Sequence, residues 1–113
     1  NSMIFKRECL NERPEWMDKA PVGDIPLMLL CASQGKIGYI DNVMSAYRVM
    51  TENSWSASIK ASSDKRKKHF YAILYMWDNF DDWTKRRYHH IVVRKKMKNK
   101  WLYLKGKIKN ILK

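Results

Sequence analysis

The side chains best suited to chemistry stand between residues 21 and 56. Asp24 begins an apolar run of helical length, and a carboxylate can accept a proton from a hydroxyl group. Tyr47 and Arg48 close a strand-like run, and a guanidinium can bind phosphate through two parallel hydrogen bonds. Trp55 stands in a polar loop and offers a flat apolar ring. These four residues are the candidates for a functional site.

Each candidate also has an ordinary structural explanation. An aspartate at the start of a helix most often caps the helix. Successive side chains of a strand point to opposite faces, so Tyr47 and Arg48 fit an edge aromatic residue and a solvated base. Trp55 buries a large area and can simply anchor its loop to the core. Residue types alone leave both explanations open.

The helix expected to position Asp24 has clear ends. A break at residues 20–23 precedes it, and Asp24 is the expected N-cap. Pro26 lies in the first turn, where its missing N–H is tolerated. The helix should end near Gln34, because Gly35 provides a permissive C-terminal cap.

A small antiparallel β-hairpin is expected after this helix. Its strands are residues 37–40 and 43–49, and residues 41–42 form the turn. Upstream, residues 2–6 predict a short strand, and residues 10–19 predict a loop with a short helical turn.

The stretch resembles the C-terminal part of the catalytic domain of family 2 glycosyltransferases of the GT-A type. That family carries the string p-x-G-D-x-x-L-x-l-x-l-a-x-x-G-k-i-x-y-i-d-e-v-l-s-x-Y-R-x-H. The matching residues are Pro21, Gly23, Asp24, Leu27, Leu29, Ala32, Gly35, Lys36, Ile37, Tyr39, Ile40, Val43, Ser45, Tyr47 and Arg48. With the upstream strand, the resemblance covers about residues 2–56, half of the chain.

The resemblance implies a fold and a division of the chain. We expect a mainly α protein with one small antiparallel β-hairpin. Residues 1–56 would be the acceptor-side segment of a GT-A α/β fold, and residues 57–113 a basic helical extension. The chain would then be an excised C-terminal piece of a longer enzyme.

The resemblance also implies roles for the candidates. The full-length enzyme would transfer a sugar with inversion from a nucleotide-sugar donor to an acceptor hydroxyl, with Asp24 as the general base. Tyr47, Arg48 and Trp55 would contact the donor diphosphate or the acceptor. A saccharide or lipid-linked acceptor is implied, as in the synthesis of bacterial surface polysaccharides or glycolipids.

The donor-binding residues of the family are missing from this chain. It has no Gly-rich phosphate loop and no Asp-x-Asp motif, so the implied divalent metal, Mn or Mg, would be held mainly by the absent N-terminal half. Met50 replaces a His that is common in the family, so no metal contact is assigned here. The three histidines lack the spacing of a metal site and are expected to be ordinary helix residues. The chain alone should be inactive.

The second half of the chain predicts helices. An apolar stripe with helical spacing consists of Phe70, Ile73, Leu74 and Trp77. Residues 78–82 predict a connection, and a last helix should start at Trp83 or Thr84. A second stripe consists of Met97, Trp101, Leu104, Ile108 and Ile111. We expect this second stripe to pack inward against the first.

The positive charge is confined to the end of the chain. Residues 1–82 hold 11 Lys and Arg against 11 Asp and Glu, whereas residues 83–113 hold 12 Lys and Arg and no acid. So many unbalanced cations repel one another, which favours contact with an anionic membrane surface or with phosphate. Two cysteines without metal spacing fit a reducing compartment, and no run of 18 apolar residues exists. We therefore expect a cytoplasmic protein, peripheral on the inner face of the membrane.

Two other functions fit the sequence. One is a non-enzymatic helical module whose basic C-terminal helix binds nucleic acid or an anionic surface. Its support is the charge alone, since aromatic residues are not interleaved with the bases as in a stacking platform. The other is a structural helical segment that docks onto a partner subunit.

Overall fold

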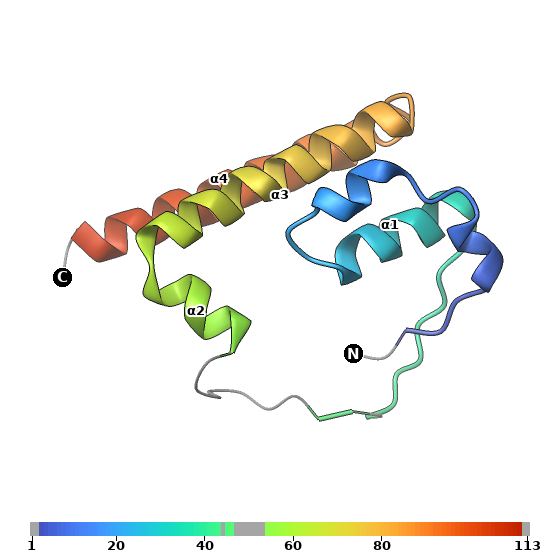
Figure 1. Ribbon diagram of the computed structural model, residues 1–113, viewed down its shortest axis with the longest axis horizontal. Coiled ribbons are helices and arrows are strands. Elements are labelled where there is room, and N and C mark those ends of the chain that lie inside the picture. Colours follow the sequence, from blue (N-terminus) through green and yellow to red (C-terminus); the bar gives the residue numbers. More distant parts are fainter. Residues whose placement is uncertain (1–2, 44, 47–53, 112–113) are drawn as a thin grey trace.

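The computed structural model describes residues 3–43, 45–46 and 54–111. Two short 3-10 helices precede four α-helices along the described chain (Figure 1). The elements are η1 (Arg7–Leu10), η2 (Glu15–Lys19), α1 (Asp24–Gln34), α2 (Trp55–Ala61), α3 (Ser63–Trp83) and α4 (His89–Ile111).

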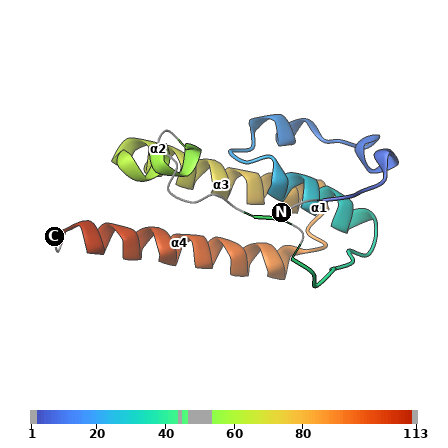
Figure 2. The same ribbon diagram turned by 90° about the horizontal axis from the view of Figure 1, so that it is seen from below.

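The two longest helices, α3 and α4, form an antiparallel hairpin (Figures 1 and 2). The N-terminal elements pack against one end of α3, and α2 packs near its other end. The buried core consists of Trp16, Met76, Trp77, Phe80 and Val92. It therefore joins η2, α3 and α4 in one cluster.

A tight turn makes the hairpin possible. The Lys85 N–H donates to the Asp82 carbonyl at 2.9 Å, and the Arg86 N–H donates to the Asp81 carbonyl at 2.8 Å. This pair of bonds is the Schellman motif that ends many helices. Lys85 and Arg86 both have positive φ, 50° and 61°, although glycine usually occupies the first of these positions. The turn therefore holds two residues other than glycine in a left-handed conformation that costs about 1 kcal/mol each.

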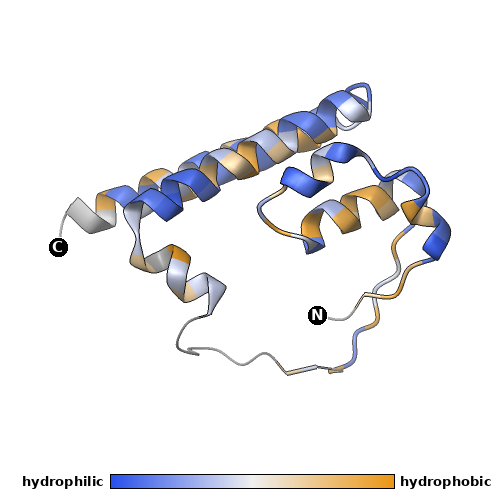
Figure 3. Ribbon diagram, viewed as in Figure 1, coloured by the Kyte–Doolittle hydropathy of each residue, from blue (hydrophilic) through white to orange (hydrophobic). Residues whose placement is uncertain are grey.

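The N-terminal elements are fixed to α3 by aromatic contacts. The Trp16 ring of η2 meets Phe80 edge-to-face with centroids 6.4 Å apart. Ile25 and Leu29, one turn apart on α1, pack against the same cluster, while Leu30 is fully buried. Figure 3 shows that α1 is largely apolar, whereas α3 and α4 mix polar and apolar residues along their lengths. α1 is thus attached to the core through the side that carries Ile25 and Leu29.

The predicted β-hairpin is wrong for the described residues. They contain no strand, so the expected α/β architecture is not present, and the chain is mainly helical. Residues 36–43 are extended and exposed, with no neighbouring strand. A strand requires partners for its N–H and C=O groups, and β-forming residues alone do not supply them. The predicted strand at residues 2–6 fails for the same reason over its described part, residues 3–6.

The predicted connection at residues 78–82 is also wrong, since α3 continues through it to Trp83. Although residues 78–82 are mostly polar, the apolar stripe of the helix continues through Phe80, which is buried. The last helix begins at His89, later than predicted, because residues 84–88 form the turn. α1 begins one residue before the expected start and ends at Gln34 as expected. The stripe from Phe70 to Trp77 is helical, with Trp77 buried and its other members half-buried.

The second predicted stripe faces solvent instead of α3. Met97, Trp101, Leu104 and Ile108 are 56–65% exposed. The face of α4 that meets α3 is offset from that stripe and includes Val92, Lys96 and Tyr103. The Tyr103 ring stacks on Phe70 with centroids 4.1 Å apart, and Lys96 pairs with Asp78. These contacts and the short turn decide which of two equally spaced rows is buried.

Candidate functional site

Asp24 is the first residue of α1, and Gly23 takes the N-cap position that the sequence assigned to Asp24. Its carboxylate is exposed, and its Oδ1 accepts a hydrogen bond from the Ile25 N–H at 2.9 Å. The partial positive charge of a helix N-terminus stabilises an ionised carboxylate there. One carboxylate oxygen is therefore engaged locally, while the group as a whole remains open to solvent.

The helix beneath Asp24 is held firmly. Pro26 and Leu30 are buried, and Ile25 and Leu29 pack on the core cluster. A functional group is most precisely placed when it stands on a packed element. Asp24 meets that condition, because it is presented at the surface by a helix whose other face is anchored.

The other sequence candidates do not assemble around Asp24 in the described structure. Tyr47 and Arg48 lie outside the described residues. Trp55 begins α2, where Ser54 is the N-cap and accepts from the Ala57 N–H at 3.2 Å, so the predicted loop is a helix start. α2 packs on α3 and lies apart from α1 in both ribbon views (Figures 1 and 2).

Trp55 has a structural contact and a free surface. Its ring meets the His69 ring of α3 edge-to-face, with centroids 5.1 Å apart. The residue nevertheless remains 55% exposed. It therefore anchors α2 to α3 and still presents part of its ring to solvent.

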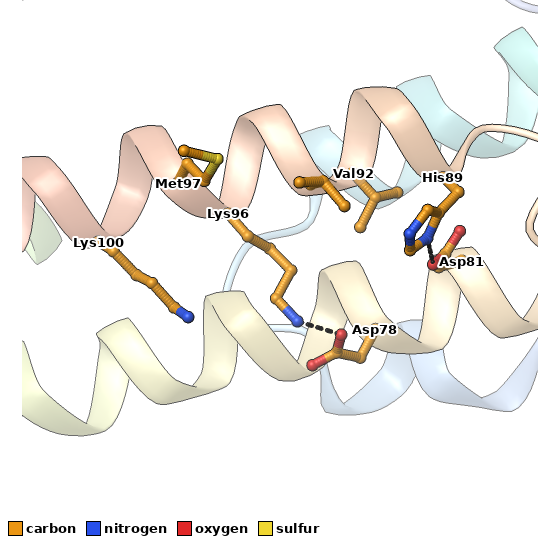
Figure 4. A pocket seen from close by; sticks show the side chains of 8 residues that line it. Asp78, Asp81, His89, Val92, Lys96, Met97 and Lys100 are labelled. Atoms are coloured by element: carbon orange, nitrogen blue, oxygen red, sulfur yellow. Dashed lines mark hydrogen bonds and ion pairs between the residues drawn. The ribbon is translucent and has the colours of Figure 1, made fainter.

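A cluster that the sequence did not indicate joins α3 and α4 (Figure 4). Asp81 is 7% exposed, and its Oδ2 lies 2.6 Å from Nδ1 of His89. An Arg86 Nη2 lies 3.0 Å from Nε2 of His89. That nitrogen is also 3.4 Å from Nδ1, so it lies over the ring face and not in line with Nε2. A carboxylate accepts, so the Nδ1–H donates to Asp81. His89 is the first residue of α4, and it also links that helix to α3, which was not predicted.

A shallow hollow of about 220 Å³ adjoins this cluster. Its lining residues are Asp78, Asp81, His89, Val92, Val93, Lys96, Met97 and Lys100. Lys96 reaches across the hairpin to Asp78, and His89 donates to Asp81, so most of the polar side chains of the hollow are already paired (Figure 4). These side chains therefore hold the two helices together, and the hollow offers little free chemistry.

The missed pair has no local sequence signal. Asp81 and His89 are eight residues apart, and one continuous helix through both would separate them by about 12 Å along its axis. Only the turn at residues 84–88 brings them together.

The two cysteines are neighbours in space, although 22 positions separate them. Burial raises the pKa of the Cys31 thiol, and the adjacent Cys9 side chain raises it further. Both thiols are free and half-buried. Gln34 of α1 also donates to the Cys9 carbonyl at 3.0 Å, so the contact belongs to the packing of η1 on α1.

The described residues contain no group of three His, Cys, Asp or Glu side chains placed to hold a metal ion. Within the same residues, no helix combines the length and the apolar character that crossing a bilayer requires.

Known proteins do not supply a function for this chain. No protein-family model, no curated protein and no solved structure matches it. Function is therefore inferred from the residues and their geometry.

Proposed function

We propose that this chain is the acceptor-side part of an inverting glycosyltransferase, with Asp24 as the general base. The observation that carries the proposal is the exposed carboxylate of Asp24 at the start of the anchored helix α1. The ordered resemblance of residues 21–48 to family 2 transferases agrees with it. The absence of strands in the described residues concerns the fold and does not bear on whether Asp24 can accept a proton.

In the proposed reaction, Asp24 takes the proton of an acceptor hydroxyl as its oxygen attacks the anomeric carbon of the donor. The new C–O bond forms while the bond from that carbon to the diphosphate breaks, and the electron pair leaves on the phosphate oxygen. Attack from the face opposite the leaving group inverts the configuration. A hydroxyl is a poor nucleophile until its proton is being removed, so the step needs a carboxylate at this place.

Donor binding is assigned to residues beyond Asp24. Tyr47 and Arg48 are proposed to contact the donor diphosphate, which suits the paired N–H groups of arginine. The exposed part of the Trp55 ring is proposed to cover a sugar face. A divalent metal, Mn or Mg, would neutralise charge on the leaving diphosphate and would be held by protein outside this chain.

The exposed extended segment supports the idea that further protein covers this part of the chain. Its large apolar residues at the surface are Ile37, Tyr39, Ile40 and Val43. Four large apolar side chains exposed within one short segment suit a contact with another protein surface. A donor-binding part packed on this segment would lie next to the end of α1, because the segment follows that helix directly.

We further propose that the enzyme works at the cytoplasmic face of the membrane as a peripheral protein. Saccharide or lipid-linked acceptors would be met there. The positive charge of residues 83–113 supports this placement, because an anionic leaflet attracts clustered Lys and Arg.

The test is the Asp24→Asn change in the full-length enzyme. Asn keeps a capping side chain of nearly the same volume, so folding should change little. Turnover should fall by about two to four orders of magnitude. The matched control is Asp64→Asn, which changes the exposed acid in the first turn of α3 and should leave turnover near normal. Equal effects of the two changes would contradict the assignment.

A second candidate function is a non-enzymatic module that binds an anionic surface. The observation that favours it is α4, which carries eight Lys and Arg and no acid. If a full-length protein with intact Asp24 transfers no sugar from any nucleotide donor while α4 binds anionic surfaces, this candidate replaces the first.

A further inference from the structure

One face of α4 is apolar and uncovered. Its members are Val93, Met97, Trp101, Leu104 and Ile108, which we call the apolar arc. At roughly 100° per residue, these side chains fall within an arc of about 80°. Each is at least 40% exposed. Val93 and Met97 also border the hollow between α3 and α4, whereas Trp101, Leu104 and Ile108 do not line it. A helix in a soluble protein ordinarily turns such a face toward the core, so this one requires another explanation.

Cations flank the apolar arc on both sides. On one side, helical spacing places Arg94, Lys98 and Lys105, and on the other it places Lys100 and Lys107. Lys105 Nζ lies 4.9 Å from the centre of the Trp101 ring, within cation–π range. The pattern is a narrow apolar strip between two rows of positive charge. This is the layout of a helix that lies in the plane of a membrane interface.

The position of α4 in the molecule leaves room for such a surface. Figure 2 shows α2, α3 and the N-terminal 3-10 helices on one side of α4, which forms one edge of the molecule along its length. With 23 residues, α4 is about 35 Å long, so the whole strip can meet a flat surface at once.

A second copy of the chain does not fit this face. Pairing two apolar arcs would bring the flanking cations of both α4 helices together with no acid on either helix to compensate. Nucleic acid would account for the cations, but it would leave the apolar residues in contact with water or phosphate. An anionic lipid surface satisfies both, since headgroups meet the cations and acyl chains receive the arc.

We infer that α4 is an interfacial helix that lies on an anionic membrane leaflet with Met97, Trp101, Leu104 and Ile108 inserted. α3 packs on a different side of α4 from the inserted residues Trp101, Leu104 and Ile108 and carries the rest of the protein above the surface. This inference sharpens the proposed peripheral placement but does not depend on sugar transfer. It can fail while the Asp24 assignment holds, and the reverse is also true.

The first experiment measures binding of the 113-residue chain to vesicles. Vesicles of phosphatidylcholine that contain about 30% phosphatidylglycerol should bind the chain. Vesicles of pure phosphatidylcholine should bind it far more weakly. The anionic binding should fall steeply with added salt. Equal binding to both vesicle types would overturn the electrostatic part of the inference.

The second experiment isolates insertion from charge. The double change Met97→Gln and Leu104→Asn leaves net charge unchanged and should lower the partition coefficient by about tenfold or more, because two inserted side chains lose their apolar surface. Met28→Gln on α1, an exposed apolar residue away from α4, is the control and should change partitioning less than about twofold. If both variants bind like the parent chain, the arc does not insert.

The third experiment tests the flanking cations. Lys98→Gln and Lys105→Gln should each lower binding to anionic vesicles by about fivefold. The matched control is Lys19→Gln on η2, on the far side of α3 from α4 in Figure 2, which should have little effect. Equal losses from all three changes would show that net charge alone acts.

Two further measurements distinguish a lipid surface from nucleic acid as the partner of α4. A blue shift of tryptophan emission on vesicle binding should disappear in Trp101→Phe, since Trp101 is the tryptophan of the arc. Single-stranded RNA should bind more weakly than the vesicles at equal phosphate concentration. Tighter RNA binding that survives Met97→Gln and Leu104→Asn would overturn the inference in favour of a nucleic-acid surface.

Discussion

His89 Nδ1 lies 2.6 Å from Asp81 Oδ2 and ties the first turn of α4 to the end of α3. The carboxylate is almost fully buried, and its Oδ1 has no hydrogen-bond partner among the described residues. A buried carboxylate with one partner is costly to leave with none. The pair is therefore expected to decide whether the hairpin closes in this register.

Removing the ring should destabilise the protein measurably. His89→Ala should lower the free energy of unfolding by about 2 kcal/mol, because Asp81 stays buried without its donor. His90→Ala, at the exposed neighbouring position, should change it by less than about 0.5 kcal/mol. Urea denaturation measures both values. In addition, nitrogen NMR at a pH where His89 is neutral should find the proton on Nδ1, and a proton on Nε2 would contradict the assigned hydrogen bonds.

The turn between α3 and α4 offers a stabilising change. Lys85 has a φ of 50° at the position where glycine usually ends a helix. Lys85→Gly should raise the free energy of unfolding by about 0.5–1 kcal/mol through relief of backbone strain. Arg87→Gly, at a turn residue without positive φ, should stabilise nothing. Thermal denaturation of the two variants tests this, and a destabilised Lys85→Gly would show that the lysine side chain matters more than the backbone.

The contact between α2 and α3 should weaken in acid. Burial lowers the pKa of His69, whose ring packs on Trp55. The folded protein therefore binds this proton less readily than the unfolded chain does. The stabilisation is complete above the ordinary pKa of about 6.5 and is lost as the pH falls through the lower folded value. Amide exchange of α2 should accelerate over that range, and His69→Gln should remove the pH dependence attributable to this position.

The thiol of Cys31 should react slowly. Burial, and then the neighbouring Cys9 side chain, raise its pKa, so less thiolate is present at a given pH. At pH 8, iodoacetamide should modify Cys31 more slowly than it modifies cysteine in an unstructured peptide. Mass spectrometry of the digested protein can show this. Because the folded pKa is raised, this group stabilises the fold below about pH 8.5, and that stabilisation is lost as the pH rises through the folded value. Cys31→Ala should reduce the loss at high pH.

The parts of the fold that were predictable depend on local signals. Residues 21–35 carry a break, an acid, a proline and a terminal glycine in the right order, and α1 has nearly the predicted bounds. The inward stripe from Phe70 to Trp77 follows from helical spacing alone. These signals require only neighbouring residues, and so the sequence could reveal them.

The parts that were mispredicted depend on distant contacts. Residues 37–43 have the composition of a strand but no neighbouring strand in the described chain. α4 carries two rows of equal spacing, and only the contacts of Val92 and Tyr103 decide that the arc faces outward. The Asp81–His89 pair exists because of a turn that lacks glycine. Of the predicted site, Asp24 is placed at its helix start, whereas Tyr47 and Arg48 lie outside the described residues.

The proposal that Asp24 removes the acceptor proton is tested most directly by the single-turnover rate of the full-length Asp24→Asn enzyme with saturating donor and acceptor. Calorimetry on the same variant measures binding of both substrates. We predict a rate lower by about 10²- to 10⁴-fold with both dissociation constants within about threefold of the parent enzyme. A near-normal rate, or a loss that follows weakened substrate binding, would contradict the role of Asp24 as the base.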